Sequence, residues 1–176
     1  MTEDEELIYL MGTILILLQA AEKVINLAMT WVLRDESVKT IDDIMRLNGE
    51  HRKKTLGFFF QRLRRTFNVN TTFNDLLKRF LTNRNLFIHN LSDVPGFDLD
   101  TEDGRKIAEE FLIKFNHDTT LVLKIFTAFT QDWLVRTGAE KKIRADSPGF
   151  YKSDFYKSVD QEILPYLDVF VARKTT

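Results

Sequence analysis

The feature that most constrains this chain is a nearly continuous apolar run from Leu7 to Leu18. It opens a segment that predicts one long helix over residues 7–33. The run is 12 residues long, whereas a helix needs about 20 apolar residues to span a bilayer. A helix that is apolar all round is buried on several sides. We therefore predict the central helix of a bundle or a subunit interface, with a membrane segment as the alternative. The polar residues that interrupt the apolar pattern are Gln19, Glu22, Lys23 and Asn26.

The middle of the chain also has helical patterns. Residues 34–54 carry a weak apolar stripe, and a strong helix begins at Thr55, a residue type that caps helix N-termini. A further helix follows the polar turn at 68–72. It ends at about Leu91, because the nearby Pro95 cannot continue a helix.

The C-terminal part is predicted to hold a long helix and a short one. The long helix begins at Asp100 or Thr101, runs to Gly138 and carries an apolar stripe mostly at i, i+4 spacing. Helix propensity is weak at 116–118, where a bend is expected. The short helix is expected near residues 159–170.

These patterns together indicate an all-α fold. No segment alternates convincingly with a period of two residues, and seven glycines with three prolines provide few turns for sandwiches or barrels. Fifteen phenylalanines predict a core rich in large aromatic side chains. We expect a four- to five-helix up-and-down bundle over residues 1–138, with a C-terminal extension at 139–176 packed on or beside it.

Composition excludes several kinds of site. The chain has no cysteine, which rules out disulfides, thiol catalysis and cysteine-bound zinc and is compatible with a reducing compartment. The N-terminus, Met-Thr-Glu-Asp-Glu-Glu, lacks the basic region with which a secretory signal peptide starts. We therefore expect a soluble, cytoplasmic protein without a membrane partner.

Charge is unevenly distributed along the chain, although the net charge is only −1. Residues 52–89 hold nine basic residues against Asp75 and carry a local charge of +8, whereas residues 93–110 carry −5. The basic block is either ordinary solvated surface or a surface that follows nucleic-acid phosphates. Its possible phosphate-binding residues are Arg52, Lys53, Lys54, Arg62, Arg64, Arg65 and Lys78.

Two helical turns contain an arginine, an amide and a histidine, namely Arg84, Asn85 and His89. Imidazole exchanges a proton near neutral pH, and guanidinium binds phosphoryl oxygens in pairs. On a wheel with 100° per residue, Arg84 lies in the middle of the apolar stripe, whereas Asn85 and His89 share its polar shoulder. A buried arginine is costly unless it is paired. Either the guanidinium of Arg84 reaches a helix end or a carboxylate, or the apolar stripe that contains Arg84 faces a second subunit. His51 and His117 lack such neighbours and are interpreted as surface histidines.

This motif resembles the signature of the HEPN superfamily, which comprises helical nucleotide- and RNA-processing domains. The signature is an arginine, usually followed by Asn, Asp or His, and a histidine after four to six intervening residues. Arg84, Asn85 and His89 match it with four residues between the arginine and the histidine. Asn90 departs from it, because many relatives carry a small residue or glycine there.

A second segment carries the same resemblance. Residues 55–63, which begin Thr-Leu-Gly, resemble the Thr-Leu-Gly helix of some HEPN proteins. The resemblance covers about residues 5–137 and leaves the C-terminal extension outside it. It implies a HEPN-like helical bundle.

The resemblance implies a metal-independent endoribonuclease at a homodimer interface, where each subunit supplies Arg84 and His89 to a shared cleft. His89 would act as a general base on a ribose 2′-hydroxyl or as an acid for the leaving oxygen. Arg84 would stabilise charge on the phosphoryl group, and Asn85 would orient the histidine or a phosphate oxygen. The products would be a 2′,3′-cyclic phosphate and a 5′-hydroxyl. No metal or other cofactor is expected, and the basic block would bind RNA in a salt-dependent way.

Two further interpretations stay open beside a ribonuclease of a toxin or defence system. Many HEPN-like proteins are adaptors, antitoxins or immunity proteins, so the alternative is a non-catalytic protein that binds a cognate toxin or antitoxin. Its possible partner-binding residues are the acidic Asp98, Asp100, Glu102 and Asp103, which would suit a basic nuclease toxin. In the third interpretation, Arg84 and Asn85 only cap or bridge helices within a dimer.

Overall fold

The computed structural model describes residues 3–32, 46–47, 49–50 and 55–137 of the chain. Its described elements are helices and one short 3-10 turn, which confirms the predicted all-α bundle. They are α1 (Glu3–Val32), α3 (Leu56–Thr66), α4 (Thr71–His89), η1 (Leu91–Asp93) and α5 (Glu102–Thr137). Most of the weak stripe at 34–54 and the whole extension at 139–176 lie outside the described residues.

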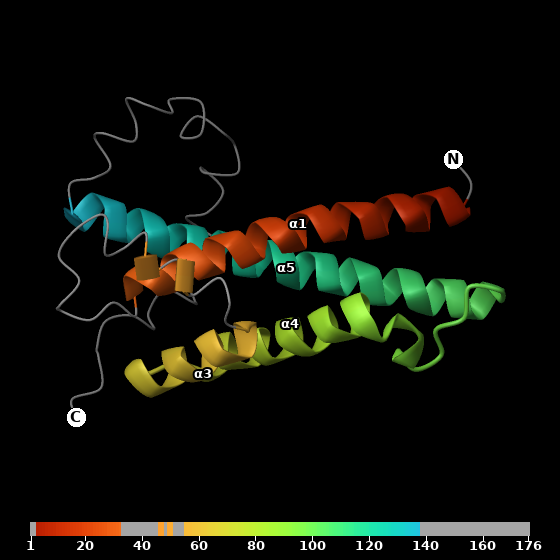
Figure 1. Cartoon of the computed structure of the whole chain (residues 1–176). Coiled ribbons are helices and arrows are strands. Elements are labelled where there is room, and N and C mark those ends of the chain that lie inside the picture. The colour runs from red at the N-terminus through yellow and green to blue at the C-terminus, as the bar shows by residue number, and fades with distance from the viewer. Residues whose placement is uncertain (1–2, 33–45, 48, 51–54, 138–176) are drawn as a thin grey trace.

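α1 and α5 form the longest helix pair of the fold. They pack side by side and run in the same direction, while α4 packs against α5 and runs in the opposite direction (Figure 1). The short helix α3 contacts both α1 and α4. This arrangement brings the middle of α1, the start of α3 and the end of α4 together.

Phenylalanine side chains from three helices fill the core. The ring of Phe126 on α5 lies 6.3 Å from that of Phe60 on α3 and 6.2 Å from that of Phe73 on α4, between centroids. Phe80 on α4 lies 6.2 Å from Phe115 on α5. All five side chains are fully buried, and each such pair adds about 0.5–1.5 kcal/mol beyond the burial of its area. The predicted aromatic core is confirmed.

The predicted cap Thr55, and Asn70 from the predicted polar turn at 68–72, define the starts of α3 and α4. The Thr55 hydroxyl accepts the backbone N–H of Phe58 at 3.3 Å, and the Asn70 side chain accepts that of Phe73 at 2.8 Å. Each bond satisfies an N–H that has no partner within the helix, which favours a helix start at that position. α4 ends at His89, two residues before the predicted end.

α5 begins where its sequence predicts. The hydroxyl of Thr101 accepts the N–H of Gly104 at 3.2 Å, and the helix continues without a break through 116–118. A Cβ on Gly104 would collide with the backbone carbonyl of Asp98. Glycine therefore allows the preceding turn to pack directly against the first turn of α5.

α1 differs from the prediction that it is buried on several sides. Its side chains Ile8, Tyr9 and Ile16 are 69%, 69% and 71% exposed. Only 22% of its most apolar window is buried, and by length and composition the helix could cross a membrane, a test that core helices and signal sequences also pass. The reason is geometric: α1 packs mainly on α5, so one face is covered and the other is left open. The apolar side chain of Ile107 on α5 is likewise exposed.

Candidate functional site

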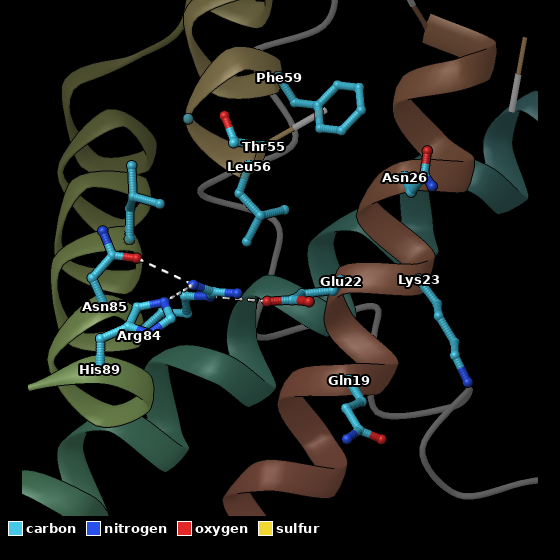
Figure 2. A pocket seen from close by; sticks show the side chains of 12 residues that line it. Gln19, Glu22, Lys23, Asn26, Thr55, Leu56, Phe59, Arg84, Asn85 and His89 are labelled. Atoms are coloured by element: carbon cyan, nitrogen blue, oxygen red, sulfur yellow. Dashed lines mark hydrogen bonds and ion pairs between the residues drawn. The ribbon is translucent and has the colours of Figure 1, made fainter. Parts of the chain in front are cut away.

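Three helices line a cleft of about 760 Å³. The middle of α1 forms one wall, the C-terminal half of α4 forms the opposite wall, and the first turn of α3 lies between them (Figure 2). Arg84, Asn85 and His89 all lie on the α4 wall. The volume is within the range of pockets that bind small ligands, about 300–1,000 Å³.

Arg84 links α4 to α1 across this cleft. Its Nε donates a hydrogen bond to Oε1 of Glu22 at 3.0 Å, and the two side chains are 24% and 34% exposed. The ion pair explains how an arginine is accommodated in an apolar stripe, because a partly buried charge needs a partner. Of the two predicted explanations, the described contact is the one in which Arg84 reaches a carboxylate of its own chain.

The other side of the Arg84 guanidinium faces the histidine. Its NH1 lies 3.3 Å from Oδ1 of Asn85 and 3.3 Å from Nε2 of His89 (Figure 2). A guanidinium N–H can only donate, so this contact is a hydrogen bond in the tautomer that carries its ring proton on Nδ1 and accepts at Nε2. Asn85 and His89 are exposed, as their place on the polar shoulder predicts. The imidazole is therefore accessible, and a neutral imidazole can accept a proton.

The α1 wall was not predicted as part of the site. Its lining residues are the ones that interrupt the apolar pattern of this helix, namely Gln19, Glu22, Lys23 and Asn26. Their spacing of three, one and three residues places them on one helical face. This spacing predicts a polar face on the helix from the sequence alone, but it does not predict which other helix that face lies opposite.

Asn26 leaves an unsatisfied atom in the cleft wall. Its side-chain oxygen Oδ1 is buried and has no hydrogen-bond partner among the residues that the structure describes. A buried polar atom without a partner costs about 1–3 kcal/mol. A ligand that presents an N–H or O–H group at this wall would offset that cost.

The first turn of α3 completes the cleft with Thr55, Leu56 and Gly57. The side chain of Leu56 extends toward the level of Arg84 in Figure 2 and gives the site an apolar surface. A Cβ on Gly57 would lie 3.8 Å from Cδ2 of Leu81, an ordinary contact distance. Packing therefore does not require glycine here, and its absent side chain leaves space in the cleft.

The basic residues expected to bind phosphates do not line the cleft where they are described. Arg64 donates from Nε to Oδ1 of Asn74 at 2.7 Å, and Lys78 lies 3.4 Å from Asp75. Arg62 and Arg65 are exposed on α3. The remaining three, Arg52, Lys53 and Lys54, lie outside the described residues and directly precede Thr55.

The acidic residues expected to bind a partner lie around the start of α5 and do not line this cleft. Asp98, Asp100, Glu102 and Asp103 are all exposed. Oδ1 of Asp98 accepts the N–H of Asp100 at 2.9 Å. The hydrogen bond from Lys106, at 2.8 Å, lowers the pKa of Glu102 below its ordinary value. Part of this acidic surface therefore has local partners.

The described part of the chain contains no obvious set of metal ligands. No three side chains among its histidines, aspartates and glutamates converge as metal ligands do. The functional groups that do converge are an arginine, an imidazole, a carboxylate and amides. The guanidinium and the amides can bind anions, and the imidazole and the carboxylate can transfer protons.

The chain matches no protein-family model, and it has no significant match among curated proteins or solved structures. The HEPN resemblance therefore rests on residues of the chain itself. Its two segments, the Thr-Leu-Gly turn at 55–57 and the motif at 84–89, line the same cleft.

Proposed function

We propose that this protein is a HEPN-like endoribonuclease of a toxin or defence system, which cleaves RNA without a metal ion. The observation that carries the proposal is the 3.3 Å contact between NH1 of Arg84 and Nε2 of His89 within an accessible cleft. A fixed cation beside an accessible imidazole supplies charge stabilisation and proton transfer together. Both are needed for phosphoryl transfer within an RNA chain.

Three side chains have separate roles in the proposed reaction. Nε2 of His89 takes the proton of a ribose 2′-hydroxyl, whose oxygen then bonds to the adjacent phosphorus. The bond from phosphorus to the 5′ oxygen breaks, and that oxygen takes a proton from water or from the imidazolium. Arg84 stabilises the charge that grows on the phosphoryl oxygens, and Asn85 orients His89 or one of these oxygens. The products are a 2′,3′-cyclic phosphate and a 5′-hydroxyl.

The wider surface supports binding of an RNA strand. The basic residues 52–54 come directly before the cleft-lining Thr55, and Arg62 and Arg65 are exposed farther along α3. Positive groups of this kind bind phosphates with release of counterions, so affinity falls as salt concentration rises. In the proposal these residues hold the strand beyond the scissile phosphate.

The test is cleavage of RNA by the purified protein in EDTA, with analysis of the product ends. The wild type should cleave and leave cyclic phosphate ends, whereas His89→Ala should lose the activity and keep its helical circular-dichroism spectrum. His117→Ala is the matched control, because it removes an exposed histidine from α5 outside the cleft. It should cleave like the wild type.

Two results would overturn the assignment. Cleavage that persists in His89→Ala, purified in the same way, would mean that His89 is not the catalytic base. Failure of the folded wild type to cut several RNA pools would remove the nuclease proposal altogether.

The second candidate is a non-catalytic immunity protein or antitoxin, which the open apolar face of α1 favours because such faces mark binding surfaces. This function needs no histidine at position 89. Capture of a cognate partner should survive His89→Ala and fail after charge reversal at Asp98, Asp100, Glu102 and Asp103. The opposite pattern would reject this candidate.

A further inference from the structure

The part of the α1 wall that faces the cleft presents oxygen atoms. Glu22 points toward Arg84, and Asn26 lies one turn farther along α1, on the side where α3 begins (Figure 2). The carboxylate of Glu22 is an acceptor, and so is the buried Oδ1 of Asn26, which has no partner among the described residues. The cation of Lys23 points away from Arg84 in Figure 2. Oxygen acceptors bind N–H groups and repel phosphoryl oxygens, so this end of the cleft suits a group with N–H donors.

The start of α3 gives the same end of the cleft an apolar surface and free space. Leu56 and Phe59 line it. Gly57 leaves room beside them, because a Cβ there would meet its nearest neighbour, Cδ2 of Leu81, only at 3.8 Å. Proteins that bind single-stranded RNA hold the flat face of a base against such side chains and read its edge with polar atoms. This end of the cleft has both features.

The spacing along α1 matches the spacing within a nucleotide. Glu22 accepts a hydrogen bond from Arg84, which holds the scissile phosphate in the proposed function. Asn26 follows four residues later, about 6 Å along the helix axis. In a nucleotide, one ribose separates the phosphate from the base, a span of similar length. A phosphate held at Arg84 can therefore place a base of the same strand beside Asn26.

We propose that this end of the cleft is a nucleobase subsite, in which Oδ1 of Asn26 accepts an N–H of the exocyclic amino group of the base. Adenine, cytosine and guanine carry such a group, whereas uracil has none and presents carbonyl oxygens that the oxygens of Glu22 and Asn26 repel. The proposal rests on the proposed ribonuclease function, which places an RNA strand in the cleft. It adds the class of base that the site selects.

Asn26 can reach the base without a change in the helix. Its side chain is partly exposed in the cleft wall. The torsion that turns the terminal amide of an asparagine is broad, so Oδ1 can rotate toward the cleft. This rotation becomes favourable when a donor is present, because the acceptor then gains the partner that it lacks.

The first test measures binding without cleavage. The two probes are fluorescein-labelled 2′-O-methyl hexanucleotides, one of adenosine and one of purine riboside, which lacks only the exocyclic amino group. The methyl group blocks the 2′ oxygen, so neither probe can be cut. In fluorescence anisotropy, the full chain should bind the adenosine hexamer about tenfold more tightly. A site built to bind an N–H rejects an analogue that leaves its polar atom unpaired.

The variant Asn26→Leu has a side chain of similar size without an acceptor. It should bind the two hexamers equally to within about twofold, because it loses affinity for adenosine. Its free energy of unfolding should not fall, since an unsatisfied buried atom is removed. Asn116→Leu on α5 is the matched control: Asn116 also has a buried Oδ1 without a partner among the described residues, and it does not line the cleft. It should keep the tenfold preference.

A second variant tests the free space instead of the hydrogen bond. Gly57→Leu puts a side chain where the base would lie, so it should weaken binding of both hexamers by about tenfold. It should keep its helical circular-dichroism spectrum, because the new Cβ has only ordinary contacts. Gly12→Leu is the control, since position 12 has no atom within 4 Å of a built Cβ and lies outside the cleft. It should bind both hexamers like the wild type.

Cleavage separates this proposal from the proposed function. In a mixed-sequence RNA, the wild type should cut beside adenine, cytosine or guanine more readily than beside uracil, and Asn26→Leu should cut without this preference. Preference for the adenosine hexamer without any RNA cleavage would keep the base subsite and reject the nuclease. Cleavage without a binding preference would keep the nuclease and reject the base subsite.

Four results would overturn the base subsite. The first is a wild type that binds the two hexamers equally or binds neither. The second is a preference for adenosine that persists in Asn26→Leu. The third is its loss in Asn116→Leu as well, which would mean that the substitution acts through the fold. The fourth is an equal loss of affinity for both hexamers in Asn26→Leu, which would place another group of the strand at Asn26.

Discussion

The ion pair between Arg84 and Glu22 shows how one contact connects stability to the candidate site. Arg84 lies in an apolar stripe, yet its guanidinium is bound by Glu22 on one side and faces His89 on the other. A charged group in a partly buried place needs such partners. These contacts compensate for the partial burial of the Arg84 charge. They also determine the direction in which the remaining N–H groups of its guanidinium point.

This pair should be measurable by a double-mutant cycle. Arg84→Ala, Glu22→Ala and the double variant should give a coupling free energy of about 0.5–1 kcal/mol in urea denaturation, because both side chains are partly exposed. The exposed pair of Lys114 and Glu110, 3.7 Å apart, is the control and should couple more weakly. Equal coupling in both cycles would mean that Glu22 does not hold Arg84 in place.

A second ion pair fastens α4 to α5. Arg79 donates from Nε and NH2 to the two carboxylate oxygens of Asp118, at 3.1 and 2.9 Å, and Asp118 is buried. Asp118→Ala should lower the free energy of unfolding by about 1–3 kcal/mol, because two charge-assisted hydrogen bonds are lost. Asp75→Ala, which breaks the exposed contact with Lys78, should cost less than about 0.5 kcal/mol. Similar losses in both variants would contradict this reading of the buried pair.

At the scale of elements, helix ends and polar faces follow local rules. Thr55, Asn70 and Thr101 each bind a free N–H of the helix that follows, and each was recognisable as a cap from its side chain. The polar face of α1 was also present in the spacing of its polar residues. The open apolar face of α1 was not, because a helical pattern does not state how many neighbours the helix has.

Two glycines in helices give an opposed pair of predictions. Gly104→Ala should destabilise the protein by about 1–3 kcal/mol, because the new Cβ collides with the carbonyl of Asp98. Gly12→Ala should raise the stability of the monomer by about 0.5–1 kcal/mol, because its Cβ meets nothing within the chain. Urea denaturation at low protein concentration measures both. A destabilised Gly12→Ala monomer, or a neutral Gly104→Ala, would contradict these environments.

At the scale of the whole molecule, one aromatic core joins three helices. Phe126 contacts Phe60, Phe73 and Phe129, with ring centroids 5.6 to 6.3 Å apart. A residue in this position holds α3, α4 and α5 together at once. The cleft depends on the same packing, since α3 and α4 supply two of its walls.

Removing this central ring should therefore affect the entire fold. Phe126→Ala should lower the free energy of unfolding by about 3–5 kcal/mol, a large share of the 5–15 kcal/mol that is typical of a domain. Ile113→Ala, which truncates an exposed side chain of the same helix, should change it by less than about 0.5 kcal/mol. Calorimetry or urea denaturation distinguishes the two. A loss below about 1 kcal/mol for Phe126→Ala would show that the core is not cooperative.

The sequence by itself determined the helical class, the starts of α3, α4 and α5, the aromatic core, and the exposure of Asn85 and His89. These properties depend on periodicity, capping and polarity, which act over one or two helical turns. Only the tertiary structure decided that Glu22 is the partner of Arg84 and that the polar face of α1 forms a cleft wall. It also decided that the described residues of the predicted phosphate-binding set, Arg62, Arg64, Arg65 and Lys78, do not line the cleft. Those outcomes depend on which helix faces meet, and packing across the core selects them among many arrangements with the same local patterns.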